Sequence, residues 1–422
     1  MTELTMPKLS DSMEEATITR WLKEPGEQFA RGEPLAEIDT DKATIVYEAE
    51  FDGVLGSILV PEGGTARLGE PIATIGAGAA ATSAAAAGMA ASVPAAPVTG
   101  GTRTIDFRTA IREALDEELE RDDRVIFFGE DVAIAGGVFA VTPGLYEKYG
   151  EERVFDTPIS ELALAGAAFG SAVSGLRPVI EIMFGDFLTL AMDSLVNQAS
   201  KYWFLTQEQV PVPIVIRSVV GAGGRFGAIH SQMPASWLLG VPGIKIACPA
   251  TPADAKGLLK AAIRDDNPVL FFEHKRLYAL EGDVDGEVVP LGSAKLVREG
   301  GDLTLVTAMK GVHDALAAAD ELAGDGIDVE VVDLRTLRPL DRATIAASVE
   351  KTSRVVVVEE GPVTGGWAGE VLAVVVEDAL GSVDDAWRIA TADAPIPYSP
   401  PLEDAFLPGP ERIAGEIRGR LA

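Results

Sequence analysis

The chain has 422 residues, of which 47% are hydrophobic and 24% charged, and its formal net charge at pH 7 is −30. This length exceeds one ordinary core and predicts two or three domains, while the hydrophobic fraction excludes general disorder. The acidic balance argues against nucleic acid and anionic membrane surfaces as partners, because no basic patch offsets phosphate repulsion. The apolar runs are too short for a membrane span, and Met1–Ser10 lacks the basic and apolar regions of a secretory signal, so we expect a cytoplasmic protein.

Residues 1–76 contain an internal repeat. The segment from Glu24 to Ile38, with the motifs EPG and GEPLAEI, recurs 37 positions later as PEG and GEPIATI, ending at Ile75. Two copies of one strand–turn–strand unit predict two similar sheets related by an approximate two-fold axis, which together form a small all-β sandwich domain.

Residues 77–98 contain twelve alanines and no charged or aromatic side chain. Such a composition cannot build a core, and its Pro, Gly and Ser residues interrupt any long helix. We therefore predict a flexible linker over residues 77–101.

From residue 102 onward, helical patterns alternate with short apolar strands. This βαβ succession predicts two doubly wound α/β domains, one over residues 102–287 and one over residues 288–422. In the first domain the patterns predict helices at 107–122, 161–176 and 193–202 and strands at 124–131, 153–160, 177–184 and 212–219. In the second domain they predict strands at 303–308, 328–334 and 354–360 and helices at 312–323, 341–350 and 366–380.

The single cysteine, Cys248, cannot form an internal disulfide. No Cys/His cluster surrounds it, so it cannot build a zinc site either. We predict a small buried residue without a chemical role.

Lys42 lies in the stretch IDTDKATI, directly after the last strand of the first repeat copy, where a turn would expose it. An isolated Asp-Lys-Ala carries little information, because most exposed lysines only add solubility. A repeat-built sandwich with a lysine at a hairpin tip and an alanine-rich tether behind it, however, resembles the lipoyl domain of 2-oxoacid dehydrogenase complexes; the related biotin carriers usually have methionine on both sides of the lysine. The resemblance implies that lipoate is attached to Lys42. This segment has 6 basic and 15 acidic residues, so we expect electrostatic steering of the carrier toward basic active-site mouths.

The span 104–422 contains a series of motifs. They are GEDV (129–132), GGVF and TPGL (136–145), RVFDTPISE (153–161), GLRPVIEIMF (175–184), IHSQ (229–232), DAKGLLKAAIRDDNP (254–268), DLRTLRPLD (333–341) and APIPYSPPLED (394–404). On these motifs the span resembles the beta subunit of the thiamine-dependent decarboxylase component of pyruvate, branched-chain 2-oxoacid and acetoin dehydrogenases. The resemblance implies a pyrimidine-binding thiamine-diphosphate domain followed by a transketolase C-terminal-like domain.

Glu161 follows Ser160 at the start of a predicted helix, where capping alone would favour a carboxylate. In the family, a carboxyl at this position binds the far ring nitrogen of the cofactor's aminopyrimidine and drives its amino group toward the imino form that deprotonates the thiazolium carbon. The carboxyl must be shielded from water for this purpose. The resemblance therefore implies that Glu161 is the catalytic acid that activates thiamine diphosphate.

Two further residues match positions with a role in the family. Phe187 matches the residue whose ring packs on the aminopyrimidine, although core packing would also explain a Phe in an apolar segment. His230 matches the active-site histidine that handles protons and anionic intermediates when the acyl group moves to lipoamide. The glycine-rich loop before His230 is neither a GxGxxG fingerprint nor a P-loop, so a nucleotide site is not predicted. We expect His274 and His313 to be structural.

The diphosphate half of the cofactor site is not expected on this chain. Thiamine enzymes bind the diphosphate through Mg²⁺ held by a Gly-Asp-Gly motif with asparagines about thirty residues later. The only candidate, Gly324–Gly326, has no asparagine after it and lies at a predicted helix–strand turn. The resemblance thus implies that an alpha subunit supplies the Mg²⁺ half in a heterotetramer of two alpha and two beta chains. The implied partners in the larger complex are a dihydrolipoamide acyltransferase core and dihydrolipoamide dehydrogenase.

A potassium site is a weaker implication of the resemblance. The helix ending before Pro268 leaves orphan carbonyls at its negative end, which ordinary helix termination also explains. Family positions that bind a structural K⁺ map to Ile214, Ala262, Ile263, Asp265 and Asn267.

The substrate is open at this stage, with pyruvate favoured over acetoin and branched-chain 2-oxoacids. A lipoyl domain fused to a beta subunit is uncommon, residues 204–213 lack the Gly-Gly often found there, and the loop around IHSQ is similar to acetoin-type subunits. A non-catalytic lipoyl carrier or assembly protein is the alternative from another class. The joint presence of Glu161, Phe187 and His230 argues against it.

Overall fold

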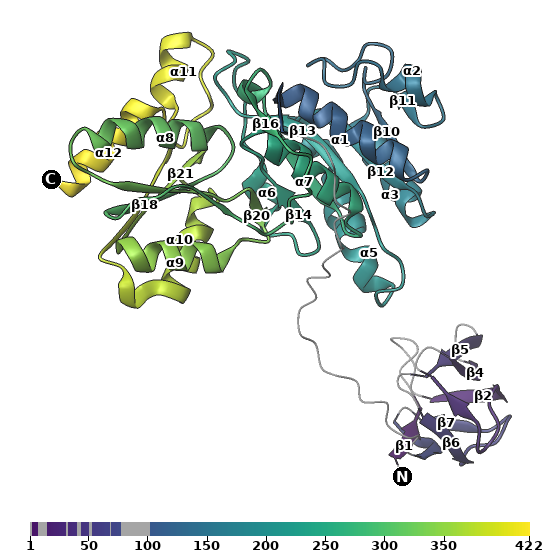
Figure 1. Cartoon of the computed structure of the whole chain (residues 1–422). Helices are drawn as coiled ribbons and strands as arrows, with labels where there is room; N and C mark the ends of the chain where they lie inside the picture. The colour runs from purple at the N-terminus through teal and green to yellow at the C-terminus, as the bar shows by residue number, and fades with distance from the viewer. Residues whose placement is uncertain are drawn as a thin grey trace. The chain divides into compact units, whose positions relative to one another are not determined.

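A computed structural model describes residues 2–6, 15–30, 33–39, 44–49, 53–67, 69–76 and 102–422. The chain divides into two compact units, Met1–Val93 and Pro94–Ala422, and Figure 1 shows both. No helix within the described ranges is long and apolar enough to cross a membrane.

The first unit contains two four-stranded antiparallel sheets. The second repeat copy begins its strands at Thr65 and Pro71, the positions that the repeat predicts from Gln28 and Pro34. Each sheet takes strands from both copies, which confirms the predicted sandwich. In sheet order the strands are β5 (Thr44–Glu48), β4 (Pro34–Asp39), β2 (Glu15–Trp21) and β7 (Thr65–Arg67), and then β1 (Thr2–Thr5), β8 (Pro71–Gly76), β6 (Gly53–Ile58) and β3 (Gln28–Phe29).

The predicted lipoylation site follows strand β4 in the sequence. Strands β4 and β5 pair antiparallel, with Asp39 opposite Thr44. Lys42 lies between them in the sequence and outside the described residues, as does the predicted linker 77–101. Both assignments therefore stay predictions.

The second unit begins with a seven-stranded sheet whose strands are almost completely buried, as expected for continuous apolar runs in a parallel sheet. Six strands are parallel, and the last, β20, pairs antiparallel with β14. The order is β11 (Val154–Asp156), β10 (Val125–Gly129), β12 (Arg177–Phe184), β13 (Val215–Val220), β15 (Val269–His274), β14 (Lys245–Ala247) and β20 (Thr336–Arg338).

Helices α1 (Phe107–Arg121) and α7 (Pro252–Arg264) pack against each other beside this sheet, and α3 (Glu161–Val173) packs on β12. Side-chain caps fix the start of α1 and α7, where Asp106 accepts from the Thr109 N–H at 2.7 Å and Thr251 from the Asp254 N–H at 3.1 Å. The smaller elements of this domain are β9 (Arg103–Asp106) paired with β16 (Glu281–Val284), α2 (Leu145–Tyr149), α6 (Ala235–Leu239) and the 3₁₀ turn η3 (Lys275–Leu277).

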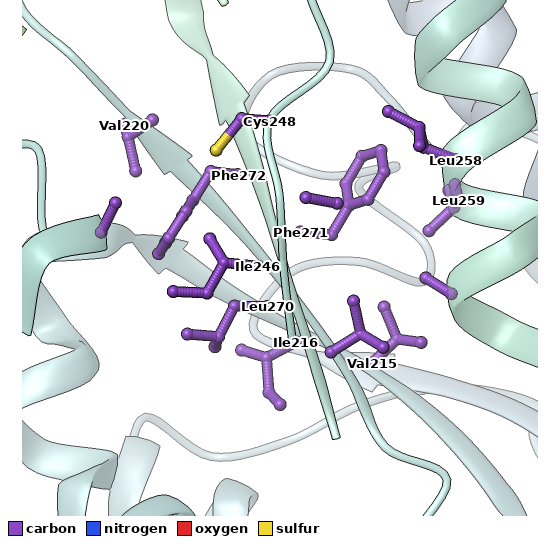
Figure 2. Close-up of a cluster of buried hydrophobic side chains, with 14 of the residues drawn as sticks. Val215, Ile216, Val220, Ile246, Cys248, Leu258, Leu259, Leu270, Phe271 and Phe272 are labelled. Atoms are coloured by element: carbon purple, nitrogen blue, oxygen red, sulfur yellow. The ribbon is translucent and has the colours of Figure 1, made fainter. Parts of the chain in front are cut away.

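Figure 2 shows the centre of this core, where aliphatic and aromatic side chains from β13, β14, β15 and α7 meet. The sulphur of Cys248 lies among them, and the residue is fully buried and unpaired. Burial raises the pKa of its thiol. The prediction of a buried cysteine is confirmed.

The helix predicted at 193–202 is part of a longer composite. A 3₁₀ turn, η1 (Gly185–Phe187), leads into α4 (Leu188–Met192), a π-helical segment η2 (Asp193–Ala199) and α5 (Ser200–Leu205). Asp193 accepts hydrogen bonds from Asn197 at 2.7 Å and Gln198 at 3.1 Å, side chains four and five residues later. This pairing matches the wider turn of a π-helix.

The C-terminal domain has a five-stranded sheet that is parallel except for β17. Helices α8 and α12 pack together on one face, and α9 and α10 on the other (Figure 1). This arrangement confirms a second doubly wound domain. The strand order is β17 (Lys295–Arg298), β19 (Val329–Asp333), β18 (Leu303–Thr307), β21 (Arg354–Pro362) and β22 (Asp385–Thr391). The helices are α8 (Lys310–Ala323), α9 (Arg342–Thr352), α10 (Ala368–Ala379), η4 (Leu380–Ser382), α11 (Pro400–Phe406) and α12 (Pro410–Leu421).

The Gly-Asp-Gly sequence forms the turn between α8 and β19, as predicted. Gly326 has a φ of +82°, and Asp325 pairs with Arg418 at 2.6 Å. Its carboxylate is therefore occupied by a structural ion pair.

Candidate functional site

The carboxyl ends of β10 and β11 bring the first group of site residues together. Glu130 directly follows β10, and Thr157 directly follows β11. The Thr157 N–H donates to the Gly129 carbonyl at 2.8 Å, which ties the two strand ends to each other. The short segment after Thr157 leads straight into α3, so Glu161 begins its helix close to the same edge of the sheet.

Glu161 is the first residue of α3. The Ser160 hydroxyl caps this helix by accepting from the Ala163 N–H at 3.4 Å, as its sequence predicts. The side chain of Glu161 is only 7% exposed. A carboxylate at a helix N-terminus is stabilised by the dipole, and here it is also largely shielded from water.

Glu130 lies close enough to Glu161 for their charges to interact. Burial, and then repulsion from Glu161 and Asp131, raise the pKa of Glu130. One of its carboxylate oxygens, Oε1, is buried without a hydrogen-bond partner, and so is the Thr157 hydroxyl. The motif GEDV marked this segment in the sequence, but only the structure shows that its glutamate faces Glu161.

Phe187 and His230 meet in an aromatic cluster at the ends of β12 and β13. The imidazole of His230 lies edge-to-face against Phe184, with centroids 4.7 Å apart, and against Phe187, with centroids 5.3 Å apart. Phe184 and Phe187 are themselves 5.8 Å apart in a T-shaped pair. The structure thus brings two of the predicted site residues into contact. In the part of the chain that the structure describes, no hydrogen bond, ion pair or ring contact joins Glu161 to this cluster.

Lys275 also belongs to this cluster, and no role for it was predicted from the sequence. Its Nζ donates to the backbone carbonyl of His230 and lies 5.5 Å from the Phe184 centroid and 5.1 Å from the Phe226 centroid. Burial lowers the pKa of this ammonium to about 8. A lone lysine after a buried strand carries no spacing signal, so sequence reasoning could not single it out.

The other two histidines make structural contacts. His313 Nε2 lies 2.8 Å from the carbonyl of Ala250, and His274 Nε2 lies 2.8 Å from a carboxylate oxygen of Glu360. Both contacts join the domain of the seven-stranded sheet to the C-terminal domain.

The residues mapped to a potassium site surround the end of α7. Arg177 donates to the Ile263 carbonyl at 2.9 Å and to the Asp265 carbonyl at 2.7 Å, so a guanidinium already lies against two of these oxygens. The Ile214 carbonyl accepts from the Val269 N–H, and the Ala262 carbonyl from the Asp265 N–H. Each carbonyl retains a second lone pair, and the potassium assignment stays a prediction for Ile214, Ala262, Ile263, Asp265 and Asn267.

The group around Glu161 fits one end of a planar heterocycle that carries hydrogen-bond donors. Two buried oxygens without partners, on Glu130 and Thr157, lie beside a shielded carboxylate, and a half-buried phenylalanine ring is available at Phe187. Large apolar side chains near these residues in the sequence are exposed, which is typical of a surface that another chain covers. They are Ile134, Val138, Ile159, Leu162, Phe226 and Ile229, with exposed fractions of 77%, 53%, 84%, 55%, 46% and 66%.

Three family profiles match the chain. The transketolase pyrimidine-binding domain matches residues 103–281, the transketolase C-terminal domain residues 292–413, and the biotin-requiring enzyme domain, which carries biotin or lipoyl groups, residues 2–75. The chain therefore belongs to the class of transketolase-like proteins with an added carrier-type domain.

Individual relatives show which family within this class the chain belongs to. The beta subunit of the pyruvate dehydrogenase E1 component of Rhizobium meliloti is 39% identical over 99% of this chain and 98% of that protein. The beta subunit of an acetoin:2,6-dichlorophenolindophenol oxidoreductase of Cupriavidus necator is 44% identical over 75% of this chain and 97% of that protein. The 2-oxoisovalerate dehydrogenase beta subunit of Bacillus subtilis is 45% identical over 74% of this chain and 98% of that protein. The chain is thus a member of the E1 beta subunit family of 2-oxoacid dehydrogenases.

A solved structure agrees on the fold. The split-gene transketolase described as an inactive beta4 tetramer has a TM-score of 0.64, with 22% identity, over 75% of this chain and 98% of that chain.

Proposed function

We propose that this chain is the beta half of a thiamine diphosphate-dependent enzyme that decarboxylates a 2-oxoacid, with pyruvate favoured, and passes the acyl group to a lipoyl group. The observation that carries the proposal is the shielded Glu161 with Glu130 and its unpartnered oxygen beside it. Such a pair can hold a hydrogen bond to a ring nitrogen without competition from water.

When bound, thiamine diphosphate supplies the carbon nucleophile that attacks the 2-oxo group. Glu161 would hold the ring nitrogen of the aminopyrimidine, and Phe187 would pack on the ring face. Glu130, whose pKa is raised, can keep or release a proton next to Glu161. His230, whose ring contacts two phenylalanine rings edge-to-face, would hold or donate the proton that the lipoyl sulphur takes up during acyl transfer.

A separate alpha subunit would provide the diphosphate and Mg²⁺ half of the site. The Gly-Asp-Gly sequence is a structural turn here, and exposed apolar side chains flank Glu130, Glu161 and His230. An interface that covers these side chains would remove them from water and complete the shielding of Glu161. The names of the relatives, each called a beta subunit, support an alpha partner in a tetramer of two alpha and two beta chains. The further partners in this proposal are an acyltransferase core and dihydrolipoamide dehydrogenase.

Pyruvate is the favoured substrate because of the share of the chain that its relative matches, not because of the percentage of identical residues. The pyruvate dehydrogenase beta subunit of Rhizobium meliloti matches 99% of the chain, including the N-terminal domain. The acetoin- and oxoisovalerate-type relatives are slightly more identical but match only about three quarters of the chain. A panel of pyruvate, acetoin and branched-chain 2-oxoacids on the reconstituted alpha–beta enzyme decides among them; turnover of acetoin alone would overturn the choice.

Glu161→Gln tests the catalytic assignment. The amide keeps the shape of the side chain but cannot exchange a proton, so we expect decarboxylation by the reconstituted enzyme to fall by at least about a hundredfold. The exposed Glu147→Gln variant is the matched control and should keep wild-type turnover. Full turnover in Glu161→Gln would refute the assignment, and no thiamine-dependent turnover of the wild type with any panel substrate would support a non-catalytic carrier.

Lys42→Arg tests the carrier assignment. Arginine keeps the positive charge but cannot form the lipoyl amide, so intact-mass analysis should show the lipoyl mass on the wild type and none on the variant. The Lys23→Arg control, in the same domain, should be modified like the wild type. A lipoyl mass that persists in Lys42→Arg would place the modification elsewhere.

A further inference from the structure

Hydrogen bonds attach the loop that carries His230, residues 221–234, to the C-terminal domain. Two carboxylates on that domain accept backbone N–H groups at the start of this loop: Glu360 accepts from Ala222, and Glu403 accepts from Gly223 at 3.0 Å. Arg225 strengthens the same attachment through Glu403 at 2.5 Å and Asp404 at 2.7 Å.

His274 links this attachment to the strand beneath the loop. Its Nδ1 accepts from the Arg276 N–H at 3.2 Å, which fixes the tautomer, so its Nε2–H donates to Glu360 at 2.8 Å. The ring also fills the space beside Gly221, where a Cβ would lie 2.2 Å from His274 Nε2. Gly221 has a φ of +87°, so the loop can leave β13 only through glycine at this point.

Lys275, the next residue, reaches the far end of the loop. Its Nζ donates to the carbonyl of His230 itself, in the aromatic cluster that also holds the His230 ring. Within the described ranges, no carboxylate lies within ion-pair distance of this ammonium, so its hydrogen bond to His230 is not shared with a salt bridge. The half-buried ammonium of Lys275 thus has a neutral carbonyl as its acceptor. This indicates that the geometry of the loop, rather than charge pairing, determines where Lys275 lies.

We infer that Lys275, anchored through His274 and Glu360, is a positioning residue that orients His230 for transfer of the acyl group to the lipoyl carrier. The inference rests on the proposed function and deepens it. In that transfer the dithiolane S–S bond breaks, one sulphur forms the thioester bond to the acyl carbon, and the other sulphur takes up a proton. The two electrons that the disulfide gains come from the acyl unit, whose hydroxyl would lose its proton to become the thioester carbonyl. The bond that held the acyl carbon would break, and its electron pair would return to the cofactor. His230 must face the second sulphur to supply its proton, whereas decarboxylation precedes this step.

The test separates the two half-reactions in the reconstituted alpha–beta enzyme. Decarboxylation is measured with an artificial dye as electron acceptor, and acyl transfer with a free lipoylated domain. For Lys275→Met we expect the ratio of lipoyl-coupled to dye-coupled turnover to fall by about ten- to a hundredfold, because a small misplacement of a catalytic group has this effect. Lys275→Arg, which can still donate, should restore the ratio to within a few fold, and the exposed Lys295→Met control should leave it unchanged.

The pH profile adds a readout that a merely structural lysine would not change. Asp186 from η1, Glu360 from β21 and Glu403 from α11 attract the ammonium, and burial opposes them, which leaves its pKa at about 8. The ammonium is present below that pH and lost above it, so the wild-type ratio should decline above about pH 8 and the Lys275→Arg ratio should not.

Several outcomes would overturn the inference. Equal loss of both turnovers in Lys275→Met, or an unchanged ratio, would reject a role in orienting His230. If Lys275→Met does not fold, Glu360→Gln serves as the second variant, because it weakens the His274 contact and should lower the same ratio. An enzyme without lipoyl-coupled turnover in the wild type would instead reject the proposed function.

Discussion

Glu130 directly follows β10, and Glu161 is the first residue of α3. The raised pKa of Glu130 depends on burial and on the charge of Glu161, and these come together only when β10 and β11 lie side by side. Of the two, only Glu161 could be recognised from the sequence, because it follows a capping serine inside a long family motif. Lys275 was missed because its partner, the carbonyl of His230, is 45 residues away in the sequence.

The position of Glu130 leads to a prediction about stability. Its folded pKa is raised, so its contribution to stability is fully present below the unfolded pKa and is lost as the pH rises through the folded pKa. At higher pH the folded chain pays a free-energy cost for holding the Glu130 carboxyl in a buried place near Glu161. Glu130→Gln removes the ionisable group and with it this cost. The melting temperature of the purified variant should therefore exceed that of the wild type by about 1–3 °C at pH 7.5 and by less at pH 4.5. Thermal unfolding at both pH values checks this, with Glu147→Gln as the exposed control. A Glu130→Gln chain that is less stable than the wild type at pH 7.5 would contradict the cause assigned to the shift.

At the element scale, strands and helices with a clear period were predictable, and their exceptions have physical causes. The single helix expected at 193–202 is instead a π-helical segment followed by a short α-helix, because a period of 3.6 cannot reveal where a turn widens. The motif DLRTLRPLD was visible, but β20 within it forms only through pairing with the distant β14.

The turn after α5 offers a second prediction. Gln207 and Glu208 have φ values of +51° and +67°, although both are exposed and neither is glycine. The left-handed region strains residues with a Cβ, so Gln207→Gly or Glu208→Gly should each stabilise the chain by about 0.5–1 kcal/mol.

Denaturant unfolding of the two variants measures this effect. The matched control is Gln209→Gly in the same turn, which is exposed and has no positive φ, so glycine there should only add entropy to the unfolded chain. The strain argument fails if all three glycine variants are destabilised alike.

At the scale of the whole molecule, the two compact units have separate hydrophobic cores. The domain order was predictable from composition, repeats and motifs, since each segment carries its own pattern. The arrangement of carboxylates that hold the His230 loop was not, because it joins residues from two domains.

Because the two units have separate cores, we expect the second unit to fold and function without the first. A chain that starts at Pro94, paired with the alpha subunit, should keep the dye-coupled turnover and the melting temperature of the full chain to within about 1 °C. It should lose only the ability to accept acyl groups on itself. Calorimetry and dye-coupled assays of the full and shortened chains make the comparison, and a shortened chain that melts several degrees lower would show that the two units stabilise each other.

The strand β20 belongs by sequence to the C-terminal domain but by hydrogen bonding to the sheet of the domain before it. The domain of the seven-stranded sheet and the C-terminal domain could not separate without breaking the hydrogen bonds between β14 and β20. We therefore expect heat to melt these two domains in a single step.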